Sequence, residues 1–227
     1  MKGENWKLVE IYRNSKLRLF CKKSIKISPR KENKNYSSYK IMDSNEEIIL
    51  LNIIHLTSAM YKDEESRNER ARTTSDELRK IEEEIFGDSE YKSIVMGDFN
   101  LQPYSRGISG IWGFNATMSI PKAKRKIRLI GGEKKFYYFN PTWHLMGRNQ
   151  MIQGTYYLDS NQQDLSMFWY SFDEVLIRPC FIDKFNWDFF SIVERTKDFN
   201  FISNHKINKK DFSDHLPIKF EIIEEKE

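Results

Sequence analysis

The feature that most constrains the fold is an amphipathic helix placed between two apolar runs, all within residues 47–100. The runs Glu47–His55 and Ser93–Met96 have the length of strands and are mostly apolar, which is typical of strands covered on both faces. Between them, Asp63–Gly87 predicts a helix with one apolar face, made by Ala71, Leu78, Ile81 and Ile85. The order strand, helix, strand predicts a β–α–β unit with parallel strands.

Both strands of this unit end in polar residues. The first ends at His55, and the second breaks at Gly97 directly before Asp98 and Asn100. Because ligands gather beyond the carboxyl ends of strands in α/β proteins, Asp98 and Asn100 are candidates for a functional loop. The simpler alternative is a turn in which Gly97 supplies positive φ and Asp98 or Asn100 caps the next segment. For His55, the alternative is a hydrogen-bonded core residue.

Further strand-like segments flank this unit. A hairpin is predicted from Trp6–Tyr12 and Lys16–Phe20 around residues 13–15, with the second run continuing through Ile27. Pro29–Lys34 indicates a polar loop before an antiparallel strand over Tyr36–Met42. Later strands are predicted at 171–177, 189–193 and 218–223.

Composition restricts the class of protein. The chain has 227 residues, 39% of them apolar, which suits one folded domain over residues 1–227. No apolar run approaches the roughly 20 residues of a membrane span, and the start lacks a secretory signal. Two isolated cysteines, Cys21 and Cys180, give no metal or disulfide spacing. We therefore expect a cytoplasmic protein without a membrane partner.

A net charge of +4 is compatible with an anionic substrate without requiring one. The basic cluster Lys122–Arg128 has two interpretations, a solvated loop, which is the simpler, and a phosphate-backbone contact. The aromatic residues Tyr104, Trp112 and Trp143 could stack on bases, although core positions are the commoner role for such side chains.

Several polar residues near predicted strand ends form a chemically coherent set: His55, Asp98, Asn100, Asp173, Asp214 and His215. Carboxylates suit a hard cation such as Mg²⁺. Hydrolysis of a phosphate ester needs such a cation and a group that orients or deprotonates water. A histidine held in one tautomer by a carboxylate performs that second task near neutral pH.

Three motifs together resemble the endonuclease/exonuclease/phosphatase superfamily, which has the deoxyribonuclease I-like fold. Their order and spacing agree with that family, and the strand-end His55 and the segment Pro141-Thr142-Trp143 resemble further family features. The resemblance runs from about residue 6 to the C-terminus. The motifs are Gly97-Asp98-Phe99-Asn100, Phe172-Asp173-Glu174-Val175-Leu176 and Ser213-Asp214-His215-Leu216-Pro217-Ile218.

The resemblance implies an α/β (α+β) fold, a four-layer α/β/β/α sandwich of two mostly antiparallel sheets. It implies that Asp98 binds or orients the attacking water and that Asn100 holds this water or the phosphate. Asp214 would contribute to binding Mg²⁺ or Mn²⁺, with Asp98 as a second ligand. His215, oriented by Asp173, would contact the phosphate or act as general base, and His55 would serve the phosphate or the leaving group.

The chain departs from the family at its start. The family opens with a β–α–β unit whose strands end in an Asn and in a metal-binding Glu, and we expect this chain to begin after both. Glu4 and Glu10 do not fit that position. We therefore expect an N-terminally truncated fold: a fragment, an enzyme completed by a partner chain, or an inactive relative. Retention of the later motif residues favours a fragment.

Two functions follow from these observations. The first is a metal-dependent phosphoesterase acting on a phosphodiester, for which nucleic acid is a candidate. The second is a catalytically inactive binding or regulatory module on the same fold. Because a missing edge unit exposes backbone hydrogen-bonding groups, we also expect self-association, or binding of a complementing chain, at that edge.

Overall fold

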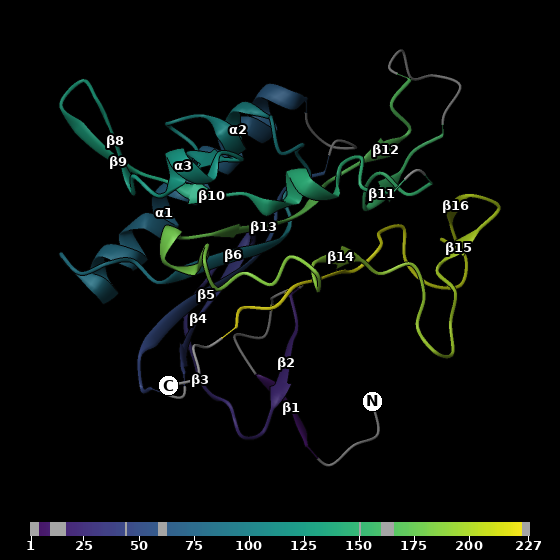
Figure 1. The fold of residues 1–227 in the computed structure, drawn as a ribbon, viewed down its shortest axis with the longest axis horizontal. Helices are drawn as coiled ribbons and strands as arrows, with labels where there is room; N and C mark the ends of the chain where they lie inside the picture. The colour runs from purple at the N-terminus through teal and green to yellow at the C-terminus, as the bar shows by residue number, and fades with distance from the viewer. Residues whose placement is uncertain are drawn as a thin grey trace.

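The computed structural model describes residues 5–9, 17–43, 45–58, 63–149, 151–159 and 166–223. Its centre is a mixed seven-stranded sheet in the order β3-β4-β5-β6-β13-β10-β7, and Figure 1 shows these strands lying side by side. Neighbours are antiparallel except for the parallel pairs β5–β6 and β10–β7. The predicted α/β class and the mostly antiparallel pairing are confirmed.

The strands of this sheet are β3 (Lys26–Glu32), β4 (Tyr36–Met42), β5 (Ile48–His55), β6 (Ser93–Asp98), β7 (Ala116–Thr117), β10 (Tyr138–Phe139) and β13 (Asp173–Ile177). Two-stranded pairs are formed by β1 (Trp6–Val9) with β2 (Leu19–Lys22), β8 (Ile127–Ile130) with β9 (Glu133–Phe136), β11 (Tyr156–Tyr157) with β12 (Trp169–Tyr170), β14 (Ser191–Ile192) with β17 (Ile218–Lys219), and β15 (Ile202–Ser203) with β16 (Lys206–Ile207). The helices are α1 (Glu64–Phe86), α2 (Arg106–Ser109) and α3 (Ile120–Ala123), with 3₁₀ turns η1 (Pro141–Leu145) and η2 (Pro179–Phe181).

The predicted β–α–β unit is present as β5, α1 and β6. The side chain of Asp63 accepts a hydrogen bond from the Ser66 amide at 2.7 Å, so Asp63 caps the helix start. Gly87 ends the helix at positive φ. Strand β5 runs parallel to β6, so the carboxyl ends of both strands lie at one edge of the sheet.

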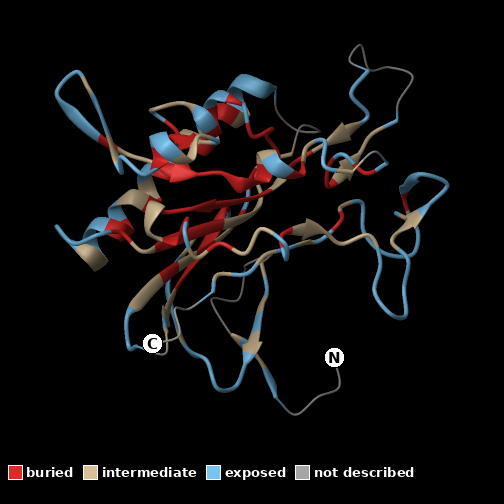
Figure 2. Ribbon diagram, viewed as in Figure 1, coloured by how far each residue is buried: buried red, intermediate tan, exposed pale blue. Residues whose placement is uncertain are grey.

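The sheet separates two apolar clusters, and Figure 2 shows that buried residues concentrate on its strands. On one face, α1 contributes Ala71, Leu78 and Ile81 to a core with side chains such as Val95 and Leu176. On the opposite face, segments 179–193 and 217–223 pack Phe185, Phe190, Ile218 and other apolar residues against the sheet. In the described parts of the chain, the backbone of this second layer is paired in β14–β17 and at one isolated bridge, and it does not form a full second sheet. Its apolar side chains pack against the central sheet over a longer stretch than its backbone is paired.

Three predicted boundaries were wrong. Residues 29–32 belong to β3 instead of a loop, because β3 is an edge strand and tolerates Pro29 next to an irregularity in register between Pro29 and Lys31. The run through Ile27 is broken by a turn in which the Ile25 amide donates to the Lys22 carbonyl oxygen. The final strand is paired only over β17, apart from one bridge at Ile222.

Several predictions about the ends and the environment of the chain stay predictions, including truncation, a cytoplasmic location and association at a sheet edge. Glu4, Glu10 and the predicted turn at residues 13–15 lie outside the described residues. In the described part, no helix has the length and apolarity that a membrane crossing requires. Both Cys21 and Cys180 are free thiols.

A buried ion pair connects α1 to the sheet. Arg178 and Glu82 are both buried; Arg178 Nε donates to Glu82 Oε1 at 2.8 Å, and a second contact joins Arg178 Nη2 to Glu82 Oε2. The Tyr138 hydroxyl donates to Glu82 Oε1 at 2.8 Å, and its ring centroid lies 3.6 Å from the guanidinium. Removing one partner would leave the other charge buried without compensation.

We expect Arg178→Met to lower the free energy of unfolding by about 3–5 kcal/mol, because Glu82 would stay buried without its cation. Urea denaturation measures this change. The control Arg72→Met removes the exposed pair with Glu69 and should change stability by about 0–1 kcal/mol. Equal effects of the two substitutions would contradict the importance assigned to the buried pair.

Candidate active site

The ends of three neighbouring strands bring three polar residues to one edge of the sheet. In the parallel β5–β6 pair, His55 lies opposite Asp98. In the antiparallel β6–β13 pair, Asp173 lies opposite the same Asp98. Residues opposite one another point to the same face of a sheet, so His55, Asp98 and Asp173 share one face. His55 Nε2 is 3.6 Å from Asp98 Oδ2, and the His55 side chain is 46% exposed.

The loop after β6 fixes the orientation of the Asp98 carboxylate. The Asn100 backbone amide donates to Asp98 Oδ1 at 2.8 Å, and Asn100 Nδ2 donates to Asp98 Oδ2 at 2.7 Å and to the Leu56 carbonyl oxygen at 3.0 Å. Because both partners of the Asn100 amide nitrogen are acceptors, its two N–H groups are used within the site. The turn function suggested by the sequence is therefore present, and it holds a carboxylate in place.

Gly97 is required for this arrangement. Its φ is +132°, and a Cβ at this position would lie 2.1 Å from the Ile54 carbonyl oxygen. A larger residue would force β5 and β6 apart at the point where His55 and Asp98 emerge.

His215 reaches the site from a distant part of the chain. Its Nδ1 is 2.7 Å from Asp173 Oδ2. The backbone next to it is held by a bridge between Tyr156 and His215 and by the Leu216 amide, which donates to the Thr155 carbonyl oxygen at 2.7 Å. The ring of Tyr156 lies with its centroid 4.9 Å from that of His215. These contacts fix both the position and the tilt of the imidazole.

The electrostatics of the site show crowding of negative charge. Burial, together with the nearby charge of Asp173, raises the pKa of Asp98 from 3.8 to about 7, although His215 and hydrogen bonds from Asn100 act in the opposite direction. Burial lowers the pKa of His215, but its hydrogen bond with Asp173 and the charges of Asp173, Asp98 and Asp214 outweigh burial, so this pKa is raised overall.

Three side chains could hold a metal ion together. One ligand atom from each of Asp98, Asp173 and His215 lies within 4.8 Å of the others. Asp214, predicted as a metal ligand, is exposed and is not part of this group of three. Its carboxylate is near enough to raise the pKa of His215.

Sequence reasoning missed two residues that support the site. The Thr155 hydroxyl accepts a hydrogen bond from the Asp173 amide at 3.1 Å, and Tyr156 stacks on Phe172 with ring centroids 5.4 Å apart. A further cation, Lys209, has its Nζ 4.8 Å from the Tyr156 ring centroid. The sequence carries no local signal for this role, because periodicity does not report which distant segments residues 154–158 contact.

The predicted aromatic and basic residues lie at the surface or close to it. Tyr104 and Trp112 are about half exposed, so the core interpretation was wrong for them. Trp143 is half-buried and has its ring centroid 6.0 Å from that of Tyr104. Within Lys122–Arg128, Lys124 pairs with Asp183 at 2.6 Å and Lys126 with Glu90 at 2.7 Å.

The raised pKa of Asp98 predicts a pH dependence of stability in the presence of a chelator. Between pH 4 and 7 the folded state holds a proton on Asp98 that the unfolded chain has released, so stability falls as pH rises through this window. Asp98→Asn lacks this titrating group. Its free energy of unfolding, relative to that of wild type, should therefore increase by on the order of 3–4 kcal/mol as pH rises from 4 to 7. Urea denaturation of both proteins in EDTA at pH 4.5–8 measures the difference, and a constant difference would contradict the prediction.

Comparison with known proteins finds solved structures that match this chain at low sequence identity. No protein-family model matches the sequence, and no curated protein does. Among solved structures, truncated TDP2 from Caenorhabditis elegans matches at 16% identity over 88% of this chain and 68% of its own, with a TM-score of 0.47. An endonuclease/exonuclease/phosphatase family protein from Bacteroides thetaiotaomicron matches at 14% over 82% and 54%, with a TM-score of 0.44.

The mannosyl-6-phosphatase Bt3783 from Bacteroides thetaiotaomicron VPI-5482 matches at 13% identity over 83% of this chain and 55% of its own, also with a TM-score of 0.44. The chain thus spans between 54% and 68% of the lengths of these three structures.

Proposed function

We propose that this chain is a phosphoesterase that hydrolyses phosphodiesters with the help of Mg²⁺ or Mn²⁺. The observation that carries the proposal is the group formed by Asp98, Asp173 and His215, whose ligand atoms lie within 4.8 Å of one another. Two carboxylates and an imidazole at one sheet edge are the groups that such a reaction requires.

The donor set fits a hard divalent cation. Mg²⁺ commonly binds through one or two carboxylates and keeps several waters, and Asp98 and Asp173 offer two carboxylates on neighbouring strands. Burial and the nearby charge of Asp173 raise the pKa of Asp98, and a bound cation would favour the ionised carboxylate against both effects. The sequence resemblance adds Asp214 as a ligand. When bound, the cation would supply neutralisation of the charge that develops on the phosphate.

His215 is the candidate general base. Its Nδ1 hydrogen bond to Asp173 holds the proton of the neutral imidazole on Nδ1. Nε2 is then the atom that can accept a proton from the attacking water. Asp173 is a positioning residue in this scheme, because it fixes the tautomer and the orientation of the ring.

Asn100 and His55 would act beside this pair. Asn100 positions Asp98, since both of its amide N–H groups donate within the site, and its Oδ1 remains an acceptor that can orient the attacking water. His55 is half exposed beside Asp98. It is therefore placed to contact a non-bridging phosphate oxygen or to donate a proton to the leaving group.

A second candidate function is a binding or regulatory module that has lost metal affinity. It is favoured by the composition of the site: in the part of the chain that the structure describes, the group of three contains no glutamate, and the resemblance implies a metal-binding Glu. Calorimetric titration with Mg²⁺ and Mn²⁺ beside a hydrolysis assay separates the two functions. A protein that neither binds the metals nor hydrolyses the substrate would support the binding or regulatory module.

The test of the proposed function uses bis(p-nitrophenyl) phosphate with Mg²⁺ or Mn²⁺. We expect hydrolysis that EDTA abolishes, and we expect His215→Asn to lower kcat/KM by about 10²–10⁴-fold through loss of the base. Asp98→Asn should cause a loss of similar size because it removes a carboxylate that orients the water and binds the cation.

The matched control is His205→Asn, because His205 is exposed and Asn tolerates its positive φ of 60°. This variant should keep wild-type activity. Hydrolysis that is equally fast in wild type and in His215→Asn would refute the assignment of His215, and the same result for Asp98→Asn would refute that of Asp98.

A further inference from the structure

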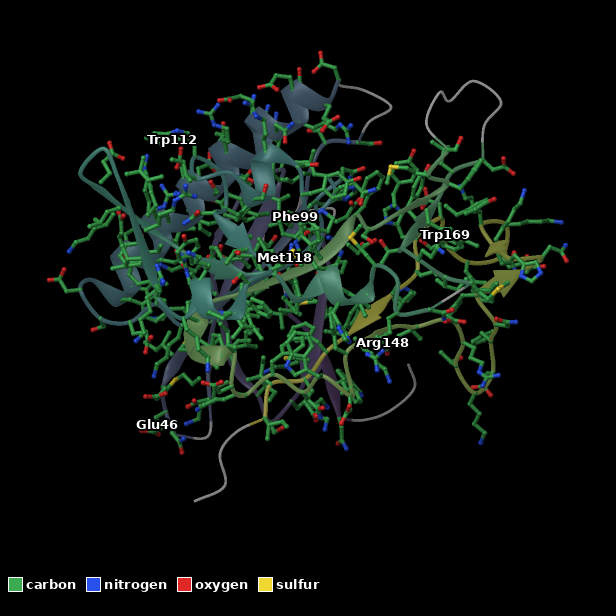
Figure 3. The ribbon with its side chains drawn as sticks, turned by 45° about the horizontal axis from the view of Figure 1, so that its top comes forward. Glu46, Phe99, Trp112, Met118, Arg148 and Trp169 are labelled. Carbon is green, nitrogen blue, oxygen red and sulfur yellow. The ribbon has the colours of Figure 1, made fainter. Side chains whose placement is uncertain are left out.

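A polar cavity lies near the edge strand β7, at some distance from the candidate active site. Its volume is about 450 Å³, and its wall includes Thr117, Met118, Lys122, Arg128, Tyr137 and Trp143. Met118, one of the wall residues, is labelled in Figure 3. The wall contains two cationic side chains and no Asp or Glu. Such a lining favours a ligand that carries negative charge and an aromatic or apolar body.

The two cations of this cavity differ from Lys124 and Lys126 of the basic cluster. Lys124 and Lys126 are paired with acids on other segments, at 2.6 and 2.7 Å. Lys122 and Arg128 form no ion pair with any described residue, and both are exposed. The cluster therefore leaves two positive charges at the cavity for an external anion.

The topology of the sheet orients the cavity toward the candidate active site. Strands β6, β13, β10 and β7 are successive neighbours, so Asp98 and Thr117 are three strand spacings apart across the sheet, about 14 Å. Thr117 is level with Ile177, four residues along β13 from Asp173, which adds about 13 Å along the strands and gives a separation of roughly 20 Å. β10 and β7 run antiparallel to β13, so their carboxyl ends point toward the edge at which Asp173 lies. The Asn140 side chain, just after β10, donates to Glu174 at 2.6 Å.

Aromatic side chains lie between the two places. The ring of Tyr156 contacts the rings of both His215 and Phe172. The ring centroid of Phe172 lies 5.2 Å from that of Tyr170. At the cavity end, Trp143 has its ring centroid 6.0 Å from that of Tyr104. The Ser171 amide donates to Gln102 Oε1 at 3.1 Å, which joins the segment of Tyr170 and Phe172 to the loop that carries Tyr104.

We propose that the cavity is a distal subsite for single-stranded nucleic acid, with Lys122 and Arg128 each contacting one of two backbone phosphates while bases stack on Trp143 and Tyr104. The inference rests on the proposed function, since it assumes that the scissile phosphate lies at Asp98 and His215. Unpaired bases are required because only they expose faces for stacking. The ligand thus extends a few nucleotides along the sheet edge, which distinguishes a polynucleotide from a small phosphoester.

Binding is tested by fluorescence anisotropy with labelled oligothymidylates of 2, 4, 6 and 8 nucleotides in EDTA, where metal-dependent hydrolysis cannot occur. We expect affinity to rise with length. Lys122→Ala/Arg128→Ala should reduce the slope of log K against log salt by about 1.4, the value for two phosphate contacts on a single strand. Trp143→Ala should weaken octanucleotide binding about tenfold through loss of stacking.

The matched control is Lys31→Ala/Lys34→Ala. It removes the same charge from exposed positions on and next to β3, the opposite edge of the sheet from β7, and it should leave the salt slope at the wild-type value. Circular dichroism melting verifies that the variants are folded. An unchanged slope in Lys122→Ala/Arg128→Ala would overturn the inference. So would thymidine monophosphate, duplex DNA or anionic phospholipid vesicles binding as tightly as the octanucleotide.

Turnover separates failure of this inference from failure of the proposed function. Lys122→Ala/Arg128→Ala should keep wild-type kcat/KM on bis(p-nitrophenyl) phosphate, and its kcat/KM on the octanucleotide should fall by the same factor as its binding of that oligonucleotide at the same salt concentration. A wild-type protein that hydrolyses neither substrate refutes the proposed function, while the anisotropy series still decides the subsite. Equal kcat/KM of both proteins on the octanucleotide counts against the subsite alone.

Discussion

The parallel pairing of β5 with β6 is the constraint on which the rest of the site depends. It places His55 opposite Asp98, and it requires the bare backbone of Gly97 beside the Ile54 carbonyl oxygen. Because side chains alternate between faces, a shift of one residue in this pairing would move Asp98 to the helix-covered face. The register is held by apolar side chains on both faces, such as Leu50 under α1, so packing far from the polar residues sets their geometry.

The alternation between faces also gives two adjacent acids different environments. Asp173 lies opposite Asp98, whereas its neighbour Glu174 lies opposite Gly97, on the other face of the sheet. There Glu174 is fully buried, and burial raises its pKa well above the usual value despite a hydrogen bond from Asn140. One strand thus supplies a carboxylate to the site and a carboxyl group to the interior.

Strands alone do not complete the site. His215 belongs to a loop, and it is brought to Asp173, 42 residues earlier, through backbone contacts with Thr155 and Tyr156. A rigid sheet edge therefore meets a loop whose backbone is tied down, which is a common way to combine precise geometry with variable chemistry. The loop that carries His215 belongs to the second layer. The apolar packing of segments 179–193 and 217–223 against the sheet therefore also helps to set the position of the imidazole.

The sequence by itself determined the β–α–β unit, the ends of its helix and the residues that terminate its strands, because periodicity and capping are local properties. It also indicated a set of six polar residues, namely His55, Asp98, Asn100, Asp173, Asp214 and His215. Only the tertiary structure decided that Asp173 rather than Asp214 joins the close group of three, that Pro29 lies in an edge strand, and that Thr155 and Tyr156 support His215. These outcomes depend on which distant segments meet across the sheet, and local patterns carry no information about such partners.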